Sequence, residues 1–335
     1  MKILIIAQND LKAGIGHVNR SSLVFQNFKK KKINVDFFSF ITKYKTLFYD
    51  HAKSNLNKKL FYKKVKEANI IITDEVSCPM TLINLIKKKF ICSISPYGKV
   101  NNFAKIIFSR TKPVGVFPKT TVIKSGLSNF LPGSNFIKVN KTLYESNLKK
   151  KFIKIGISMG GYDKRNKTLK LLKIFNSLKS KIKFYVLLND NNFSHYKKVL
   201  KYIKNNKINA KTFKMKKNTW DIFSKCSLLL LSGGISAYES VFAGIPSINI
   251  INDPSKKKIT QYLEKQKLTT ILEDKHTQKI HDLIYLYINQ RNMMIKKKRL
   301  IDNFVSKICQ DPYKNLLKFI LQEYKLLKNK ESQLF

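Results

Sequence analysis

The sequence is short of acidic residues and of long apolar segments, and each shortage narrows the class of protein. Only 20 Asp and Glu residues stand against 66 Lys and Arg residues, which gives a formal net charge of +46. No run of about 18 apolar residues is present, so we expect no membrane-spanning helix. The chain enters an apolar segment at once, without the charged head and cleavage site of a signal peptide, so we also expect no leader.

Cysteine is scarce, and its spacing does not suggest a metal site. The four cysteines are isolated residues, without a Cys-x-x-Cys pair or a Cys/His cluster. This pattern favours reduced thiols in a cytoplasmic protein. The cysteines are Cys78, Cys92, Cys226 and Cys309.

The excess of positive charge is spread along the chain rather than gathered in one segment. A nucleic-acid-binding protein would concentrate its charge on one face, together with aromatic residues or arginine, and arginine is rare here. We therefore expect no nucleic acid as a partner. Distributed lysines do attract an anionic membrane surface, so peripheral association at the inner membrane face is a second expectation. Lysine clusters recur at 29–32, 87–89, 149–151, 256–258 and 296–298.

A glycine loop, Gly14-Ile15-Gly16-His17-Val18-Asn19-Arg20, lies between a predicted strand and a predicted helix. The strand is the apolar segment 3–7, and the helix, 18–30, carries apolar residues at helical spacing. Glycine lets the backbone approach a ligand closely, and a helix N-terminus favours an anion such as a phosphate. His17 would lie beside that anion, where a neutral imidazole can accept a proton. The alternative is a turn without a ligand, in which His17 is a cap or a surface residue; the third glycine of a dinucleotide site is missing.

Short apolar segments alternate with lysine-rich helical segments up to about residue 140, and again from residue 152. This alternation predicts the α/β class, with two Rossmann-like, doubly wound parallel-sheet domains facing each other across a cleft. We predict an N-terminal domain over 1–140, a linker over 141–151, a C-terminal domain over 152–305, and terminal helices over 306–335 that pack back across the crease. The predicted strands are 2–7, 34–40, 69–73, 90–94 and 113–117 in the first domain, and 152–158, 183–188, 210–213, 227–231, 247–251 and 269–272 in the second.

Ligands of such sheets bind beyond the carboxyl ends of the strands. Asp74 and Glu75 directly follow the predicted strand 69–73, so we expect at least one carboxylate to face the same cleft as His17. The alternative for Asp74 is a helix cap or a turn residue.

The second domain repeats the pattern of strand, glycine loop and helix. One loop is Ser158-Met159-Gly160-Gly161-Tyr162-Asp163, and another is Ser232-Gly233-Gly234-Ile235-Ser236 after the apolar segment 228–231. We expect backbone N–H groups of these loops to contact an anionic group. Glu239, one turn further along, can accept hydrogen bonds from the two vicinal hydroxyls of a ribose. The alternative is a solvent-facing helical residue.

These three motifs together resemble the GT-B nucleotide-sugar enzymes. The chain is most similar to the UDP-sugar hydrolases of pseudaminic acid biosynthesis and the related spore-coat polysaccharide proteins, which carry a GxGHxxR loop and an MGGxDxxN loop. Both loops are present, as Gly14–Arg20 and Met159–Asn166. The third motif, Ser232–Pro246, is shared more widely, including with the peptidoglycan N-acetylglucosaminyltransferase.

The resemblance implies an enzyme of surface glycan biosynthesis that needs no metal or other cofactor and hydrolyses a UDP-(amino-deoxy)sugar at its anomeric carbon. His17 matches the histidine that activates water or an acceptor hydroxyl, and Glu239 matches the ribose-binding glutamate. Glu75-Val76 after Asp74, and Ser95-Pro96-Tyr97, depart from the hydrolases, so a glycosyltransferase acting on a lipid or glycan acceptor stays open, as does a basic binding module without catalysis. The other expected substrate-binding residues are Gly14, Gly16, Arg20, Asp74, Gly160, Gly161, Asn166, Ser232, Gly233, Gly234 and Ser236.

Overall fold

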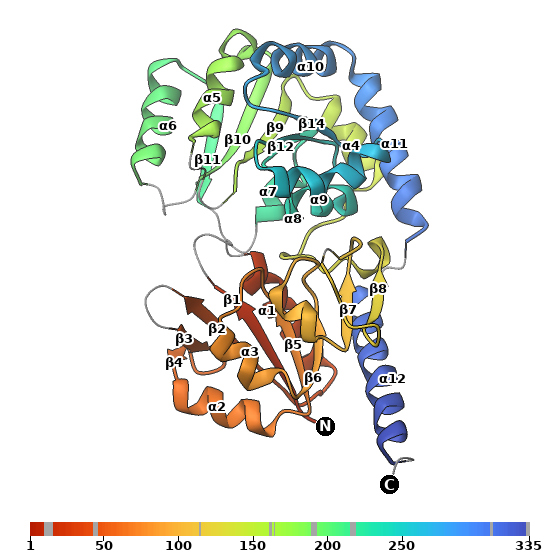
Figure 1. Cartoon of the computed structure of the whole chain (residues 1–335). Helices are drawn as coiled ribbons and strands as arrows, with labels where there is room; N and C mark the ends of the chain where they lie inside the picture. Colours follow the sequence, from red (N-terminus) through yellow and green to blue (C-terminus); the bar gives the residue numbers. More distant parts are fainter. Residues whose placement is uncertain are drawn as a thin grey trace. The chain divides into compact units, whose positions relative to one another are not determined.

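The chain forms two compact α/β units (Figure 1). Unit 1 comprises residues 1–133 and 308–335, and unit 2 comprises residues 134–307. The structure is a computed structural model. It describes residues 1–9, 16–42, 46–113, 115–160, 163, 165–188, 193–214, 219–308 and 311–332.

Unit 1 is built on an eight-stranded sheet in the order β4-β3-β2-β1-β5-β6-β7-β8. Neighbouring strands are parallel, except that β3 runs antiparallel to both β2 and β4. The strands are β1 (Ile3–Gln8), β2 (Val35–Thr42), β3 (Thr46–Asp50), β4 (Asn55–Leu56), β5 (Ile70–Asp74), β6 (Phe90–Ser93), β7 (Ile106–Ser109) and β8 (Val122–Ser125).

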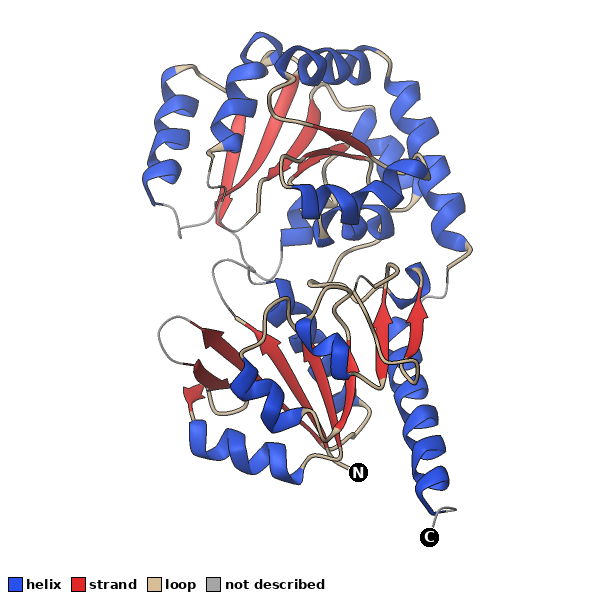
Figure 2. Cartoon of the chain, viewed as in Figure 1, coloured by secondary structure: helices blue, strands red, loops and turns tan. Residues whose placement is uncertain are grey.

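Helices cover both faces of this sheet (Figure 2), and its central strands β1 and β5 are accordingly buried at every position. Ile3 and Ile5 of β1 pack in one buried layer with residues of α1 (Gly16–Lys30) and α12 (Pro312–Ser332). Leu4 and Ile6 point the other way, into a layer with residues of α2 (Lys58–Glu67) and α3 (Met80–Ile86). Two short 3-10 helices, η1 (Lys99–Phe103) and η2 (Leu127–Asn129), complete the unit.

Unit 2 contains a six-stranded, fully parallel sheet in the order β11-β10-β9-β12-β13-β14. A single buried cluster joins its strands to the surrounding helices. The strands are β9 (Ile153–Ser158), β10 (Ile182–Leu188), β11 (Ala210–Lys214), β12 (Leu228–Leu231), β13 (Ser247–Ile250) and β14 (Thr270–Leu272). The helices are α4 (Lys141–Leu148), α5 (Lys167–Ile174), η3 (Asn176–Leu178), α6 (Phe193–Asn205), α7 (Thr219–Phe223), α8 (Ile235–Ala243), α9 (Pro254–Lys265), α10 (Thr277–Asn289) and α11 (Arg291–Ser306).

The strand predicted over 113–117 is wrong. Its described residues, all except residue 114, form no strand, and Val116 is 87% exposed. Pro113 is the first residue of this segment and Pro118 follows its last residue. Proline has no backbone N–H and cannot donate to a strand ladder. The neighbouring segments β7 and β8 extend the sheet instead.

The boundaries of the units differ from those expected at 140, 152 and 305. The segment predicted as a linker contains α4, which belongs to unit 2 because Tyr144 is fully buried and its hydroxyl donates to the Ser227 carbonyl at 2.7 Å. The last two helices belong to different units: α11 packs in unit 2 through Met294, whereas α12, in the region predicted as terminal helices, packs in unit 1 through Leu316 and Ile320. None of the described helices has both the length and the hydropathy that a membrane crossing requires.

Candidate active site

His17 and Asp74 meet at the carboxyl edge of the sheet of unit 1. Asp74 is the last residue of β5, and its register partner on β1 is Ala7, so the two strands end side by side. His17 is the second residue of α1, the helix that follows β1. Its Nδ1 lies 2.6 Å from Asp74 Oδ1, and only 13% of the His17 side chain is exposed.

Arg20 and Ser21 approach the same carboxylate from α1. They follow His17 by three and four residues, the spacing that places side chains on one face of a helix. Arg20 Nε donates to Asp74 Oδ2 at 2.7 Å, Arg20 Nη2 donates to Oδ1, and Ser21 Oγ lies 3.4 Å from Oδ2. Burial by itself would raise the pKa of Asp74, but the positive charge of Arg20 and the contact with His17 lower it well below its usual range.

The ionised state of Asp74 determines which nitrogen of His17 carries the proton. An ionised carboxylate can only accept hydrogen bonds, so the 2.6 Å contact requires a proton on His17 Nδ1. In the neutral ring the other nitrogen, Nε2, is then the proton acceptor. The same carboxylate also fixes the orientation of the ring, as a carboxylate partner does in other histidine-based sites.

The structure gives Arg20 and Asp74 a different place from the predicted one. Direct contact with substrate was expected for both, but Asp74 is fully buried and Arg20 is only 2% exposed. Their charges pair with each other. Asp74 also contacts His17 Nδ1, so the two buried side chains hold His17 in position and do not themselves face solvent. Gly16 is the first residue of α1, two residues before the predicted start of the helix, and Gly14 lies outside the described residues.

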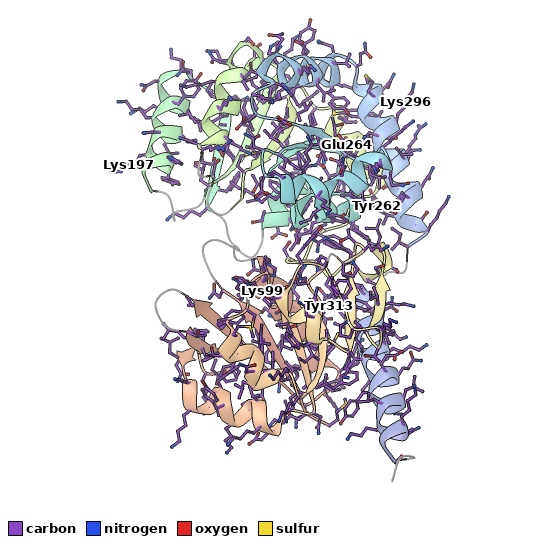
Figure 3. All side chains as sticks on the ribbon, in the orientation of Figure 1. Lys99, Lys197, Tyr262, Glu264, Lys296 and Tyr313 are labelled. Carbon is purple, nitrogen blue, oxygen red and sulfur yellow. The ribbon has the colours of Figure 1, made fainter. Side chains whose placement is uncertain are left out.

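Glu75 is a second buried carboxyl group beside this pair. Its Oε1 accepts the backbone N–H of Val100 at 3.0 Å, in the 3-10 helix that begins at Lys99 (labelled in Figure 3). Burial raises the pKa of Glu75 above its usual value. Gly98 makes room for the carboxyl group, because a Cβ there would lie 3.2 Å from Glu75 Cδ and closer still to Oε1. Glu75 therefore ties the segment after β6 to the end of β5.

In unit 2 the predicted glycine loops also come together at the carboxyl edge of the sheet. Ser158 at the end of β9 pairs with Leu231 at the end of β12. The loops that follow are in contact, because a Cβ on Gly160 would lie 3.2 Å from Ser232 Oγ. Gly160, Gly233 and Gly234 all have positive φ angles, of 83°, 78° and 74°. This conformation explains the need for glycine at these positions.

Some groups of these loops serve the fold. The N–H of Gly234 donates to Thr260 Oγ1 at 3.1 Å, and Ser236 Oγ donates to the Gly233 carbonyl at 3.1 Å. Asn166 caps α5, and its Oδ1 lies 3.4 Å from the N–H of Leu169. Asp163 accepts the N–H of Lys167 at 2.8 Å. Gly161 lies outside the described residues.

Glu239 lies on α8 and is only 6% exposed, which excludes the solvent-facing alternative. Its Oε1 accepts a hydrogen bond from Ser134 Oγ at 2.8 Å, and Trp220 Nε1 donates to the same Ser134 oxygen at 2.7 Å. Ser134 and Trp220 were not among the predicted site residues. They are 105 and 19 residues from Glu239, so no local spacing could have indicated the contact.

Two partly buried lysines, which were not predicted as site residues, lie near the carboxyl end of β13. Lys167 Nζ donates to the Ile250 carbonyl at the end of β13, at 3.1 Å. Lys256 lies on the first turn of α9, where its carbonyl accepts from Thr260 Oγ1, the group that binds the Gly234 N–H. Burial lowers the pKa of both lysines, and the charge of Lys256 lowers that of Lys167 further.

No protein-family model matches the sequence. The uncharacterized protein MJ1062 of Methanocaldococcus jannaschii is 25% identical over 289 residues, which cover 79% of this chain and 59% of that protein. The chain thus spans about three fifths of the length of this curated relative.

Solved structures are similar over nearly the whole chain. Acinetobacter baumannii MurG has a TM-score of 0.64 at 9% identity and covers 96% of this chain and 100% of its own. Anabaena HepE in complex with UDP-glucose has a TM-score of 0.59 at 11% identity, with 99% and 100% covered. The spinosyn rhamnosyltransferase SpnG has a TM-score of 0.62 at 8% identity, with 95% and 100% covered.

The chain has the GT-B fold. This confirms the predicted class of two parallel-sheet α/β domains. Within the GT-B fold, unit 1 carries the His17–Asp74 pair and unit 2 carries the glycine turns and Glu239.

Proposed function

We propose that this GT-B protein is an enzyme that uses a UDP-sugar and transfers the sugar to a hydroxyl group of a lipid or glycan acceptor in surface glycan biosynthesis. The observation that carries the proposal is the 2.6 Å contact between His17 Nδ1 and the buried Asp74. It leaves Nε2 as the basic nitrogen of the ring, which is the arrangement that a general base needs. Solved structures of the same fold support the choice of substrate, since HepE was crystallised with UDP and with UDP-glucose.

In the proposed reaction the acceptor oxygen attacks the anomeric carbon of the sugar. The bond from that carbon to the diphosphate oxygen breaks, and UDP leaves with the bonding electrons. The proton of the acceptor hydroxyl passes to His17 Nε2, and Asp74 stabilises the resulting imidazolium, as its charge does in related dyads. General-base catalysis of this kind contributes about 10²–10⁴-fold to the rate.

Unit 2 would bind the nucleotide part of the donor. The carboxylate of Glu239 is suited to accept hydrogen bonds from the ribose hydroxyls. The loops at Gly160 and Gly233 let backbone approach the diphosphate closely. Lys167 and Lys256 add positive charge at the same edge of the sheet, which favours an anionic ligand there.

Hydrolysis of the UDP-sugar is the second candidate, with water in place of the acceptor hydroxyl. The match of Gly14–Arg20 and Met159–Asn166 to the hydrolase loops favours it. The two reactions separate in an assay of UDP release from a panel of UDP-sugars, with and without candidate acceptors. Transfer predicts release that depends on an acceptor, whereas equal release without acceptor supports hydrolysis. No release from any donor would reject both.

A further inference from the structure

Trp220, Ser134 and Glu239 form a directed chain of hydrogen bonds, which we call the serine bridge. The indole N–H can only donate, so Trp220 Nε1 donates to Ser134 Oγ at 2.7 Å. The Ser134 hydroxyl proton then points to Glu239 Oε1, at 2.8 Å. Each donor has one acceptor, so the hydroxyl group has a single orientation.

The surrounding packing holds the serine bridge in place from both sides. Trp220 is 2% exposed, and its ring packs against Phe223 and Phe136, with centroids 5.4 and 6.2 Å away. The segment that begins at Ser134 is also fastened to the helix of Glu239, because Val139 N–H donates to the Ala243 carbonyl at 2.8 Å. Lys298 Nζ donates to the Val139 carbonyl at 2.6 Å from α11.

We propose that Ser134 is a positioning residue that fixes the plane of the Glu239 carboxylate for binding the ribose of the nucleotide, and that Trp220 anchors it. This inference rests on the proposed function. The last torsion of a glutamate side chain has a broad energy minimum, so its hydrogen-bond partners decide how the carboxylate is oriented. Two vicinal hydroxyls need both carboxylate oxygens at defined positions, and the hydrogen bond from Ser134 to Oε1 restricts the rotation of the carboxylate.

The inference also predicts a spectroscopic signal. The chain contains one tryptophan, so all tryptophan emission comes from Trp220. A ligand that binds the Glu239 carboxylate polarises the Ser134 hydroxyl and, through it, the indole N–H. UDP should therefore change the emission of Trp220, and the change should require the Ser134 hydroxyl.

The experiment compares the affinities for UDP and 2′-deoxy-UDP, measured by calorimetry on the full chain, in the wild type and four variants. Ser134→Ala should weaken UDP binding about tenfold and 2′-deoxy-UDP binding less than about twofold. Ser134→Thr, which keeps the hydroxyl, should restore the preference for UDP and the emission change. Glu239→Ala should lose both the preference for UDP and the change in Trp220 emission. Ser224→Ala is the matched control: Ser224 Oγ donates to the Asp221 carbonyl at 3.1 Å in the same region, and this variant should behave as the wild type.

The outcomes separate this inference from the proposed function. If the wild type prefers UDP through Glu239 and Ser134→Ala keeps that preference, the positioning role is rejected while the proposed function stands. If the wild type binds no UDP, both are rejected. If Ser134→Thr behaves like Ser134→Ala although its thermal unfolding matches the wild type, the hydroxyl is not the active group and the inference also fails.

Discussion

Asp74 combines complete burial with a lowered pKa because charged groups reach it from one helix face. Arg20 supplies the compensating charge through its contact with Oδ2, and His17 Nδ1 contacts Oδ1 of the same carboxylate. The local spacing of His17 and Arg20 and the strand before Asp74 predicted this meeting point. The burial of Arg20 was not predictable, because a Lys-rich sequence gives no indication of which cation has a buried partner.

Replacing Asp74 by Asn should destabilise unit 1 by about 3–5 kcal/mol at neutral pH, because the buried guanidinium of Arg20 loses its counter-charge. The folded-state pKa of Asp74 lies below its unfolded value, so its contribution is present above the ordinary aspartate range and is lost as the pH falls through the folded-state pKa. The difference in unfolding free energy between the wild type and Asp74→Asn should therefore become smaller at acidic pH.

Urea unfolding at neutral and acidic pH measures this difference in unfolding free energy. Asp36→Asn is the control, because Asp36 makes only partly exposed ion pairs with Lys2 and Lys64 and should cost less than about 1 kcal/mol. A loss for Asp74→Asn no larger than that of the control would contradict the role given to Asp74.

Lys256 gives a second residue-scale prediction. Lys256→Gln should weaken UDP binding about fivefold to tenfold, because the proposed nucleotide site loses a partly desolvated positive charge, and should leave uridine binding unchanged. Lys258→Gln, on an exposed position of the same helix, is the control for net charge. Equal effects of the two variants, measured by calorimetry, would show that only the overall charge matters.

At the scale of elements, the two glycines of the turn after β12 differ in what surrounds them. A Cβ on Gly233 would lie 2.9 Å from Ile251 Cγ1 and 3.1 Å from Thr260 Oγ1, whereas a Cβ on Gly234 would meet no described atom within 4 Å. Both residues have a positive φ. The turn is therefore packed on one side and open on the other.

Gly234→Ala should cost about 1–2 kcal/mol from backbone strain alone. Gly233→Ala should cost about 1–3 kcal/mol more, because Ile251 and Thr260 must also move. Thermal unfolding of the two variants measures the difference. Equal midpoints would mean that the packing on Gly233 gives way without cost.

The elements themselves were predictable where periodicity or apolar runs were strong. The central strands β1, β5, β9 and β12 consist almost entirely of buried residues, and each was placed within about two residues. The strands β3, β4, β7 and β8 were missed. β3, β4 and β8 have few buried positions or none, so their pattern is weak. β7 is buried throughout, but four residues are too few to identify a strand from an apolar run. The segment 141–151 resembles a linker because it is mostly polar and charged, although it contains α4 with the buried Tyr144.

At the scale of the whole molecule, unit 1 combines the N-terminal residues 1–133 with the C-terminal helix α12. Leu316 and Ile320 of α12 are fully buried in a layer with β1 and α1. The amphipathic pattern of this segment predicted a packed helix, but not which unit it joins, since sequence carries no signal for a contact across 300 residues. Lysines lie in both units, as the dispersed clusters suggested; Figure 3 labels Lys99 in unit 1 and Lys197 and Lys296 in unit 2.

Leu316→Ala should therefore destabilise the protein by about 2–5 kcal/mol, the cost of a cavity in a closed core. Leu326 lies on the same helix and is 55% exposed, so Leu326→Ala should change stability by less than about 0.5 kcal/mol. Denaturant unfolding followed by circular dichroism compares them. A small effect of Leu316→Ala would mean that unit 1 is stable without α12.

The central claim is that His17 acts on the reaction and not on nucleotide binding. The most direct test is to measure UDP affinity and the rate of UDP release for His17→Ala against the wild type, with the donor and acceptor that support turnover. The account predicts UDP affinity within about twofold of the wild type and a rate at least about a hundredfold lower. An unchanged rate, or a parallel loss of affinity and rate, would contradict it.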